Sequence, residues 1–90
     1  MLDKSFKVVN PTGFDAKVCS LLVNQASRFE STIKLQLNDL TVNFKSIMGV
    51  MSLNIRKGEQ VKVICSGADE EIAIGELVLF ITQNKIGKEL

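Results

Sequence analysis

The chain has 90 residues, of which 46% are hydrophobic and 23% charged, and this composition is typical of one folded domain rather than a disordered segment. Its 11 basic and 10 acidic side chains leave a formal net charge of +1, which gives no electrostatic basis for binding nucleic acid or an anionic membrane. Histidine is absent, and with it the commonest general base and the imidazole ligands of most zinc sites. We therefore expect a protein that is not an enzyme and uses no cofactor or metal.

The N-terminal segment shows no signal for export or membrane insertion. Residues 1–7 mix charged and apolar side chains, and no apolar run in the chain approaches the ~20 residues that span a bilayer. We therefore expect a cytoplasmic protein. The two cysteines, Cys19 and Cys65, lie in apolar stretches without C-x-x-C spacing, which favours buried, reduced thiols over a disulfide.

The first predicted elements are a strand and a helix. Polar and apolar residues alternate over 4–9 until Asn10-Pro11 breaks the strand, and a turn at 11–13 follows. The spacing then changes to steps of three and four, which predicts a helix over 16–28. The residues predicted to share the inward face of this helix are Val18, Leu21, Leu22, Gln25, Ala26 and Phe29.

A hairpin and a short helix are predicted next. Period-two alternation over 32–37, a tight turn at Asn38-Asp39 and a second apolar run over 40–44 indicate the hairpin. Ser46 is placed to cap a very short helix within 45–53. A helix of about six residues cannot bury its whole apolar circumference, so some of its apolar side chains should face solvent. These side chains are Ile47, Met48, Val50 and Met51.

The last predicted elements are a strand over 61–65 and a long helix over 72–83. The segment 66–71 contains acidic residues that suit the first turn of a helix, because they complement its dipole. The buried stripe of this helix is predicted to be Ala73, Leu77, Phe80 and Ile81. Ile72 and Leu79 lie on its other side and suggest a further contact.

The order of elements is β-α-β-β-α-β-α, and it determines the predicted fold class. A four-stranded sheet with one hydrophobic face cannot stand alone in water, so the helices must cover that face. We predict an α+β, open-faced β-sandwich, in which three helices cover one face of a four-stranded antiparallel sheet. The domain spans 1–90, without repeats or linkers.

Two segments of the chain resemble a known family. The run KSIMGVMSL at 45–53, followed by SGADE at 66–70, is similar to HPr, the histidine-containing phosphocarrier of the bacterial phosphoenolpyruvate-dependent sugar phosphotransferase system. The likeness extends from Phe6 to the last helix. The fold that this resemblance implies, an HPr-like open-faced sandwich, agrees with the order of elements derived above.

The resemblance identifies the start of the first helix as the phosphocarrier position. The family motif there is glycine, an apolar residue, histidine, alanine, arginine, proline, and its histidine accepts the phosphoryl group. In this chain the motif is Gly13-Phe14-Asp15-Ala16-Lys17-Val18. Asp15 therefore occupies the phosphohistidine position and Lys17 the arginine position, and no catalytic residue is predicted.

Three roles remain open for Asp15. It could be a plain helix N-cap, for which Asp is among the best residues. It could imitate phosphohistidine in part, with one negative charge where a phosphate has about −1.5 to −2. It could also accept phosphate as an acyl phosphate, which would keep the chain in the relay. Lys17 is either a solvated lysine or a contact for an anion.

The family's second functional position is a serine that a bifunctional kinase/phosphorylase modifies in Gram-positive bacteria, and Ser46 occupies it in an intact motif. A member with this serine but without the histidine resembles Crh, the catabolite-repression HPr homologue of bacilli. Crh usually has glutamine at the histidine position, so Asp15 departs from that pattern too. We predict phosphorylation of Ser46, which adds charge at a helix N-terminus without unfolding it.

The resemblance also implies partners. A Crh-like regulator would meet HPr kinase/phosphorylase and then, as corepressor, a LacI-type catabolite control protein. A relay protein, or a decoy that docks without turnover, would instead meet enzyme I and the sugar-specific phosphotransferase components. None of these roles involves direct binding to nucleic acid or membrane. The predicted partner-binding residues are Asp15, Lys17, Ser46, Ile47, Met48 and Met51.

The first strand also suggests a mode of assembly. Residues 6–9 are joined to the domain by a hinge at 10–13 that contains proline, and such a hinge beside a terminal strand can favour exchange between protomers. The chain is therefore expected to be either a monomer or a strand-swapped homodimer.

Overall fold

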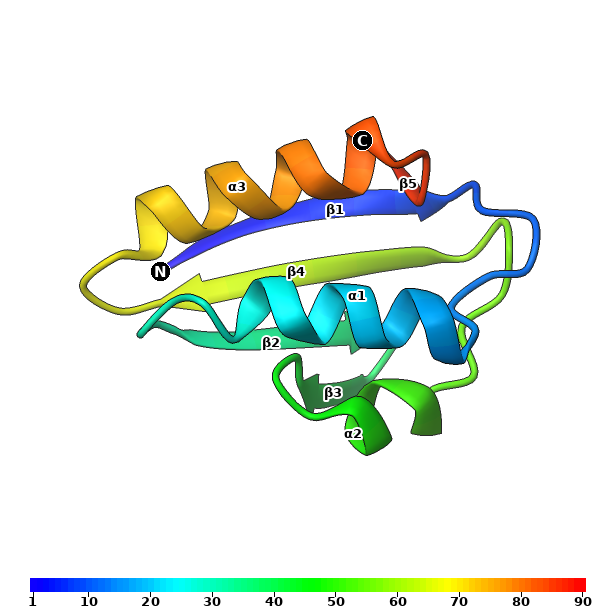
Figure 1. The fold of residues 1–90 in the computed structure, drawn as a ribbon, viewed down its shortest axis with the longest axis horizontal. Coiled ribbons are helices and arrows are strands. Elements are labelled where there is room, and N and C mark those ends of the chain that lie inside the picture. Colours follow the sequence, from blue (N-terminus) through cyan, green and yellow to red (C-terminus); the bar gives the residue numbers. More distant parts are fainter.

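A computed structural model describes residues 1–90 and contains five strands and three helices (Figure 1). The strands are β1 (Leu2–Val8), β2 (Thr32–Leu37), β3 (Leu40–Asn43), β4 (Gln60–Ser66) and β5 (Gly87–Glu89). The helices are α1 (Ala16–Ala26), α2 (Ile47–Ser52) and α3 (Glu70–Gln83). None of these helices has the length and apolar character needed to cross a bilayer.

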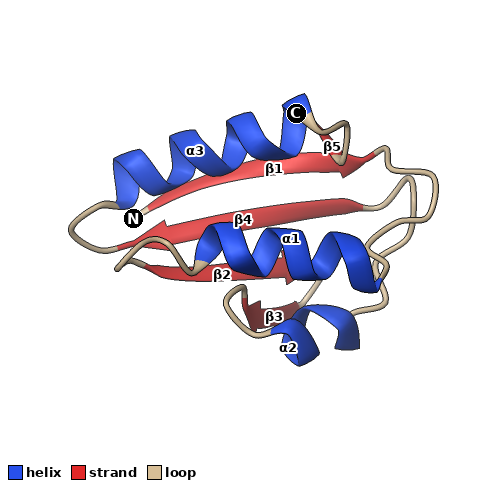
Figure 2. Cartoon of the chain, in the orientation of Figure 1, coloured by secondary structure: helices blue, strands red, loops and turns tan.

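The strands form one sheet in the order β3-β2-β4-β1-β5, and all of its pairings are antiparallel. The three helices lie over one face and leave the other uncovered (Figure 2). This arrangement confirms the predicted open-faced sandwich and, with it, the order of the first seven elements.

The core lies between the helices and the covered face of the sheet. Because side chains alternate across a strand, every second strand residue points toward the helices. The predicted inward set of β2 is confirmed, since Ile33, Leu35 and Leu37 are all buried. Cys19 and Cys65 are buried as free thiols, as predicted.

The prediction of four strands was wrong by one, because the chain adds β5 after the last helix. This strand is Gly-Lys-Glu, a composition without strand propensity, and it forms because Ile86 is buried and holds the chain against β1. Gly87 fits there because a Cβ at that position would lie 2.9 Å from Cγ2 of Ile81. Tertiary packing determines this strand, and no local pattern indicates it.

Two helix predictions also need correction. α1 ends at Ala26 rather than 28, and Leu21, predicted to be on its buried face, is 40% exposed. α3 begins at Glu70, within the segment 66–71 that was predicted to start it. Ile74 is buried although it was not in the predicted stripe, and Phe80, which was in that stripe, is only half-buried. The buried stripe of α1 is thus rotated toward Cys19 and Val23, whereas Ala73, Leu77 and Ile81 of α3 are buried as predicted. Figure 1 shows α1 and α3 over the same face of the sheet.

Candidate functional site

The entrance to α1 is held by a short chain of polar side chains. Asp15 is the N-cap, and its Oδ1 accepts a hydrogen bond of 2.9 Å from the backbone N–H of Val18. Its Oδ2 accepts a second bond, of 2.8 Å, from the hydroxyl of Thr12. The amide of Asn10 donates in turn to Thr12 Oγ1 at 3.0 Å. Both carboxylate oxygens are therefore occupied within the turn, although Asp15 itself is exposed.

Gly13 positions this turn against the loop that follows α2. Its φ is +64°, and a Cβ there would lie 2.5 Å from the carbonyl oxygen of Ile55, so only glycine fits. The next residue, Phe14, donates its backbone N–H to the same oxygen at 3.0 Å. The start of α1 and the end of α2 are thus tied together by backbone contacts.

The hydrogen bonds at Asp15 lower the pKa of its carboxyl. The bond from the Val18 backbone has the largest effect and the Thr12 hydroxyl the next. A carboxylate stabilised in this way is a weaker base and a weaker nucleophile than a free one. No group of three His, Cys, Asp or Glu side chains in the structure is placed to hold a metal ion. Asp15 therefore has the geometry of a cap, without the acidic cluster that aspartyl phosphate sites use.

Ser46 is the N-cap of α2, and its Oγ accepts a hydrogen bond of 3.1 Å from the backbone N–H of Gly49. The hydroxyl is half-buried, and a Cβ at Gly49 would lie 3.3 Å from it. Glycine at this position leaves the space around the hydroxyl open. Beside it, Lys45 donates from Nζ to the carbonyl oxygen of Phe29 at 2.6 Å, which links the start of α2 to the end of the α1 segment.

α2 presents apolar side chains to solvent, as its length predicts. Ile47, Met48 and Met51 are 40%, 83% and 44% exposed, whereas Val50 is fully buried. Leu21 of α1 adds to the exposed apolar surface of the same layer, and sequence patterning missed it because it placed this residue in the core. Lys17 is exposed in the first turn of α1 and takes part in no ion pair.

The structure places the predicted site residues on two contacting helices that run in opposite directions, so Asp15 and Ser46 lie at opposite ends of this layer. Figure 1 shows α2 alongside α1 on the covered side of the sheet. Asp15 and Ser46 each cap one of these helices. The sequence analysis did not predict the hydrogen bond from Thr12 to Asp15 or the one from Phe14 to the carbonyl oxygen of Ile55. The only residue in the sequence that indicated a tight turn at this place was Gly13. The helical layer of α1 and α2 is the candidate partner-binding surface.

Comparison with protein families gives one match. The family model described as the PTS HPr component phosphorylation site matches residues 2–83. This range includes both cap residues and every element except β5.

Solved structures with the same fold cover nearly the whole chain. HPr-C-His from Thermoanaerobacter tengcongensis is 41% identical, with 100% of each chain covered and a TM-score of 0.88. A histidine-containing phosphocarrier protein from Mycoplasma is 28% identical, with 97% of this chain and 99% of that chain covered and a TM-score of 0.92. Crh, the catabolite repression protein of Bacillus subtilis, is 38% identical, with 82% and 85% covered and a TM-score of 0.72. That Crh structure is an intertwined dimer with a swapped domain.

Proposed function

The chain belongs to the HPr family, and we propose that it is a regulatory, Crh-like member that is phosphorylated on Ser46 by HPr kinase/phosphorylase. The observation on which this proposal rests is the pair of caps. At the phosphohistidine position stands an aspartate whose two oxygens are already bonded within its turn. At the serine position stands a hydroxyl at a helix N-terminus with an intact motif around it.

The geometry of Ser46 suits phosphorylation without a change of fold. A phosphate there adds about −1.5 to −2 charges and three acceptor oxygens where α2 begins with unpaired N–H groups. The bond from Gly49 shows that one of these groups already points at the hydroxyl. Electrostatic stabilisation by the helix dipole favours the added charge.

Phosphorylation would change the surface that partners meet. The phosphate would lie next to Ile47 and Met48, which are exposed. A LacI-type catabolite control protein would bind this combination of one dianion and flexible apolar side chains, with the protein acting as its corepressor. Lys17 supplies an exposed cation on the same helical layer.

Incubation with HPr kinase/phosphorylase and ATP, followed by intact-mass spectrometry, tests the proposal. One added phosphate is expected on the wild type and none on Ser46→Ala. Ser52→Ala is the matched control, because Ser52 is an exposed serine at the opposite end of α2 from Ser46, and the variant should be phosphorylated like the wild type. Unmodified wild-type protein under conditions that phosphorylate a known HPr would refute the proposal.

The relay through Asp15 is the second candidate, favoured only by the exposure of the carboxylate at a helix N-terminus. Its mark is an acid-stable, hydroxylamine-labile phosphate after incubation with enzyme I and phosphoenolpyruvate. A decoy would instead inhibit sugar uptake while it carries no phosphate. The two bonds that Asp15 makes in its turn argue against the relay.

A further inference from the structure

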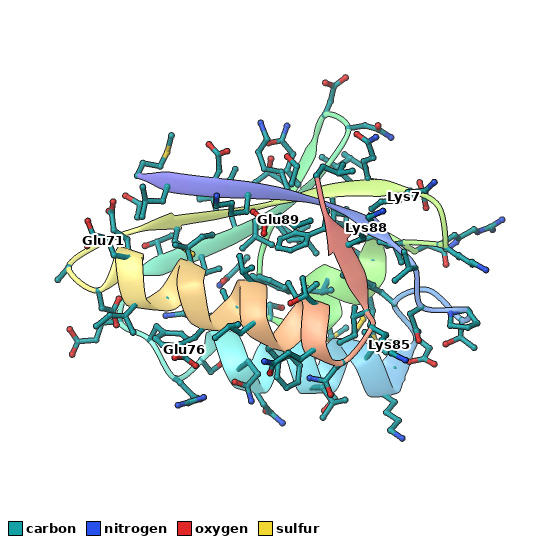
Figure 3. The ribbon with its side chains drawn as sticks, turned by 90° about the horizontal axis from the view of Figure 1, so that it is seen from above. Lys7, Glu71, Glu76, Lys85, Lys88 and Glu89 are labelled. Carbon is teal, nitrogen blue, oxygen red and sulfur yellow. The ribbon has the colours of Figure 1, made fainter.

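The uncovered face of the sheet has a charge pattern that the proposed function does not use. Because side chains alternate, this face is formed by the strand residues that point away from the helices. All basic residues on this face are lysines, namely Lys7, Lys34, Lys62 and Lys88. We call these four residues the lysine band. Figure 2 is seen from the side of the helices, so this face of the sheet is turned away from the viewer there, and Figure 3 labels Lys7 and Lys88 on their adjacent strands.

The register shows that the band crosses the sheet diagonally, with one lysine on each of four adjacent strands. Lys88 on β5 lies directly opposite Lys7 on β1. Lys62 on β4 pairs with Ser5, two residues from Lys7 along β1. Lys62 also pairs with Gln36, two residues from Lys34 on β2. With strands ~4.8 Å apart and ~3.3 Å per residue, the band extends roughly 20 Å.

No lysine of the band forms an ion pair within the protein, and the one acidic residue near it is Asp3, which pairs in register with Ile64 on β4. The two ion pairs of the structure are Met1–Glu70 and Lys4–Glu89, and neither includes a residue of the band. Asp3 is the only acidic side chain on this face, so the face has a charge of +3 and the rest of the molecule −2. Lys7 and Lys88 are direct cross-strand partners, and like charges in such positions destabilise a sheet.

The side chains between the lysines indicate which anion fits. The face has no aromatic residue and no arginine, so bases could not stack on it and phosphates could not be held by bidentate bonds. Its single large apolar side chain, Ile64, is only half-exposed, which is too little for a membrane surface. Ser5, Gln36 and Gln60 line a shallow hollow beside Lys62 and offer hydroxyl and amide donors.

We infer that the lysine band is a docking surface for an acidic protein partner, whose carboxylates pair with the lysines of the band. A flat row of lysines with polar residues between them matches a row of carboxylates better than a nucleic acid or a lipid surface. Because its side chains point away from the helices, the band lies on the opposite face of the sheet from α1 and α2, so both surfaces can be occupied at once.

Binding of poly-L-glutamate to the full chain tests this inference. The wild type should bind at low salt, with an affinity that falls as salt screens the contacts. The triple variant Lys7→Gln/Lys34→Gln/Lys62→Gln should lose affinity about tenfold, the combined effect of three weak surface contacts. It should unfold at no lower temperature than the wild type, because Lys7→Gln removes the repulsion with Lys88.

A matched triple variant separates the band from net charge. Arg56→Gln/Lys57→Gln/Lys85→Gln removes three exposed cations that lie outside the band, and it should bind within twofold of the wild type. Amide chemical shifts on adding poly-L-glutamate should change in β1, β4 and β2. An equal loss in both variants, shift changes confined to α1 and α2, or no binding at all would overturn the inference. Tighter binding of oligothymidylate through the same lysines would assign the face to nucleic acid instead and overturn it too.

Discussion

At the scale of single residues, Asp15 is a structural cap at the position that the HPr resemblance assigns to phosphohistidine. Both of its oxygens serve the turn, through Val18 and Thr12. A histidine side chain at this position could not accept both bonds at once. The hydrogen bonds that lower the pKa of Asp15 are therefore also those that fix the entry to α1.

Replacement of Asp15 should reveal this role as a loss of stability. Asp15→Ala removes the cap of α1, and we expect the Tm to fall by about 5 °C, as caps typically do in a domain of this size. Asp15→Asn should retain most of the stability, because its side-chain oxygen can still accept from Val18. Differential scanning calorimetry measures both. An unchanged Tm in Asp15→Ala would mean that the cap contributes nothing.

Asp69 makes a comparable set of bonds at the other end of the sheet. Its carboxylate accepts backbone N–H bonds of 2.9 Å from Glu30 and Ser31, and also a bond from the Ser31 hydroxyl. These bonds lower the pKa of Asp69 from 3.8, the Ser31 hydroxyl having the largest effect. Asp69 occupies the N-cap position of α3, yet its side chain makes no cap bond there. It serves the loop before β2 instead.

The lowered pKa predicts acid sensitivity. Because the folded pKa lies below the unfolded value of 3.8, the unfolded state binds more protons in acid. The stabilisation from Asp69 should be complete above pH 3.8 and be lost as the pH falls through the folded pKa. In Asp69→Asn the Tm should be lower at pH 7 and should fall less steeply below pH ~4. Asp39→Asn, in the exposed hairpin turn, is the control and should follow the wild type.

At the scale of elements, α2 divides its few residues between core and surface. Val50 is fully buried, while Met48 is 83% exposed two residues earlier. Val50, together with Leu53 directly after the helix, thus anchors α2 in the core. The other apolar side chains of the helix, Ile47, Met48 and Met51, are exposed to solvent. This division explains how a six-residue helix can be both structural and a binding surface.

Truncation of these two residues should give opposite results. Val50→Ala leaves a cavity and should destabilise the fold by about 1–2 kcal/mol, while Met48→Ala should stay within ~0.5 kcal/mol of the wild type. In contrast, Met48→Ala should weaken binding of the Ser46-phosphorylated protein to a LacI-type catabolite control protein, measured by calorimetry. Equal stability losses in the two variants would contradict the orientation of α2.

Sequence patterns predicted those elements whose position depends on local features, such as a regular spacing of apolar residues or a helix cap. The alternation of Ile33, Leu35 and Leu37 fixed β2, and the serine before an apolar run located α2. They failed where two elements share a surface. Leu21 has the spacing of a buried helical residue, but it is 40% exposed. The short strand β5 depends on the burial of Ile86, the residue before it. Neither fact is local, so no periodicity could reveal it.

At the scale of the whole molecule, β1 is bound to the sheet by pairings that a second copy could supply equally well. It is the first element of the chain, and it pairs with β4 and β5. An exchanged strand would keep each of these pairings, so only the hinge at 10–13 distinguishes the closed monomer from a swapped dimer.

The closed hinge is held by Asn10, whose side chain donates to Thr12 Oγ1 at 3.0 Å and to the carbonyl oxygen of Gly13 at 2.7 Å. Asn10→Ala removes both bonds and leaves the strand pairings intact, so it should raise the dimer fraction after incubation at high concentration near the Tm. Light scattering coupled to size exclusion measures that fraction. Asn24→Ala is the matched control, because Asn24 is exposed on α1 and outside the hinge. If the two variants remain equally monomeric, the side-chain bonds of Asn10 do not control assembly.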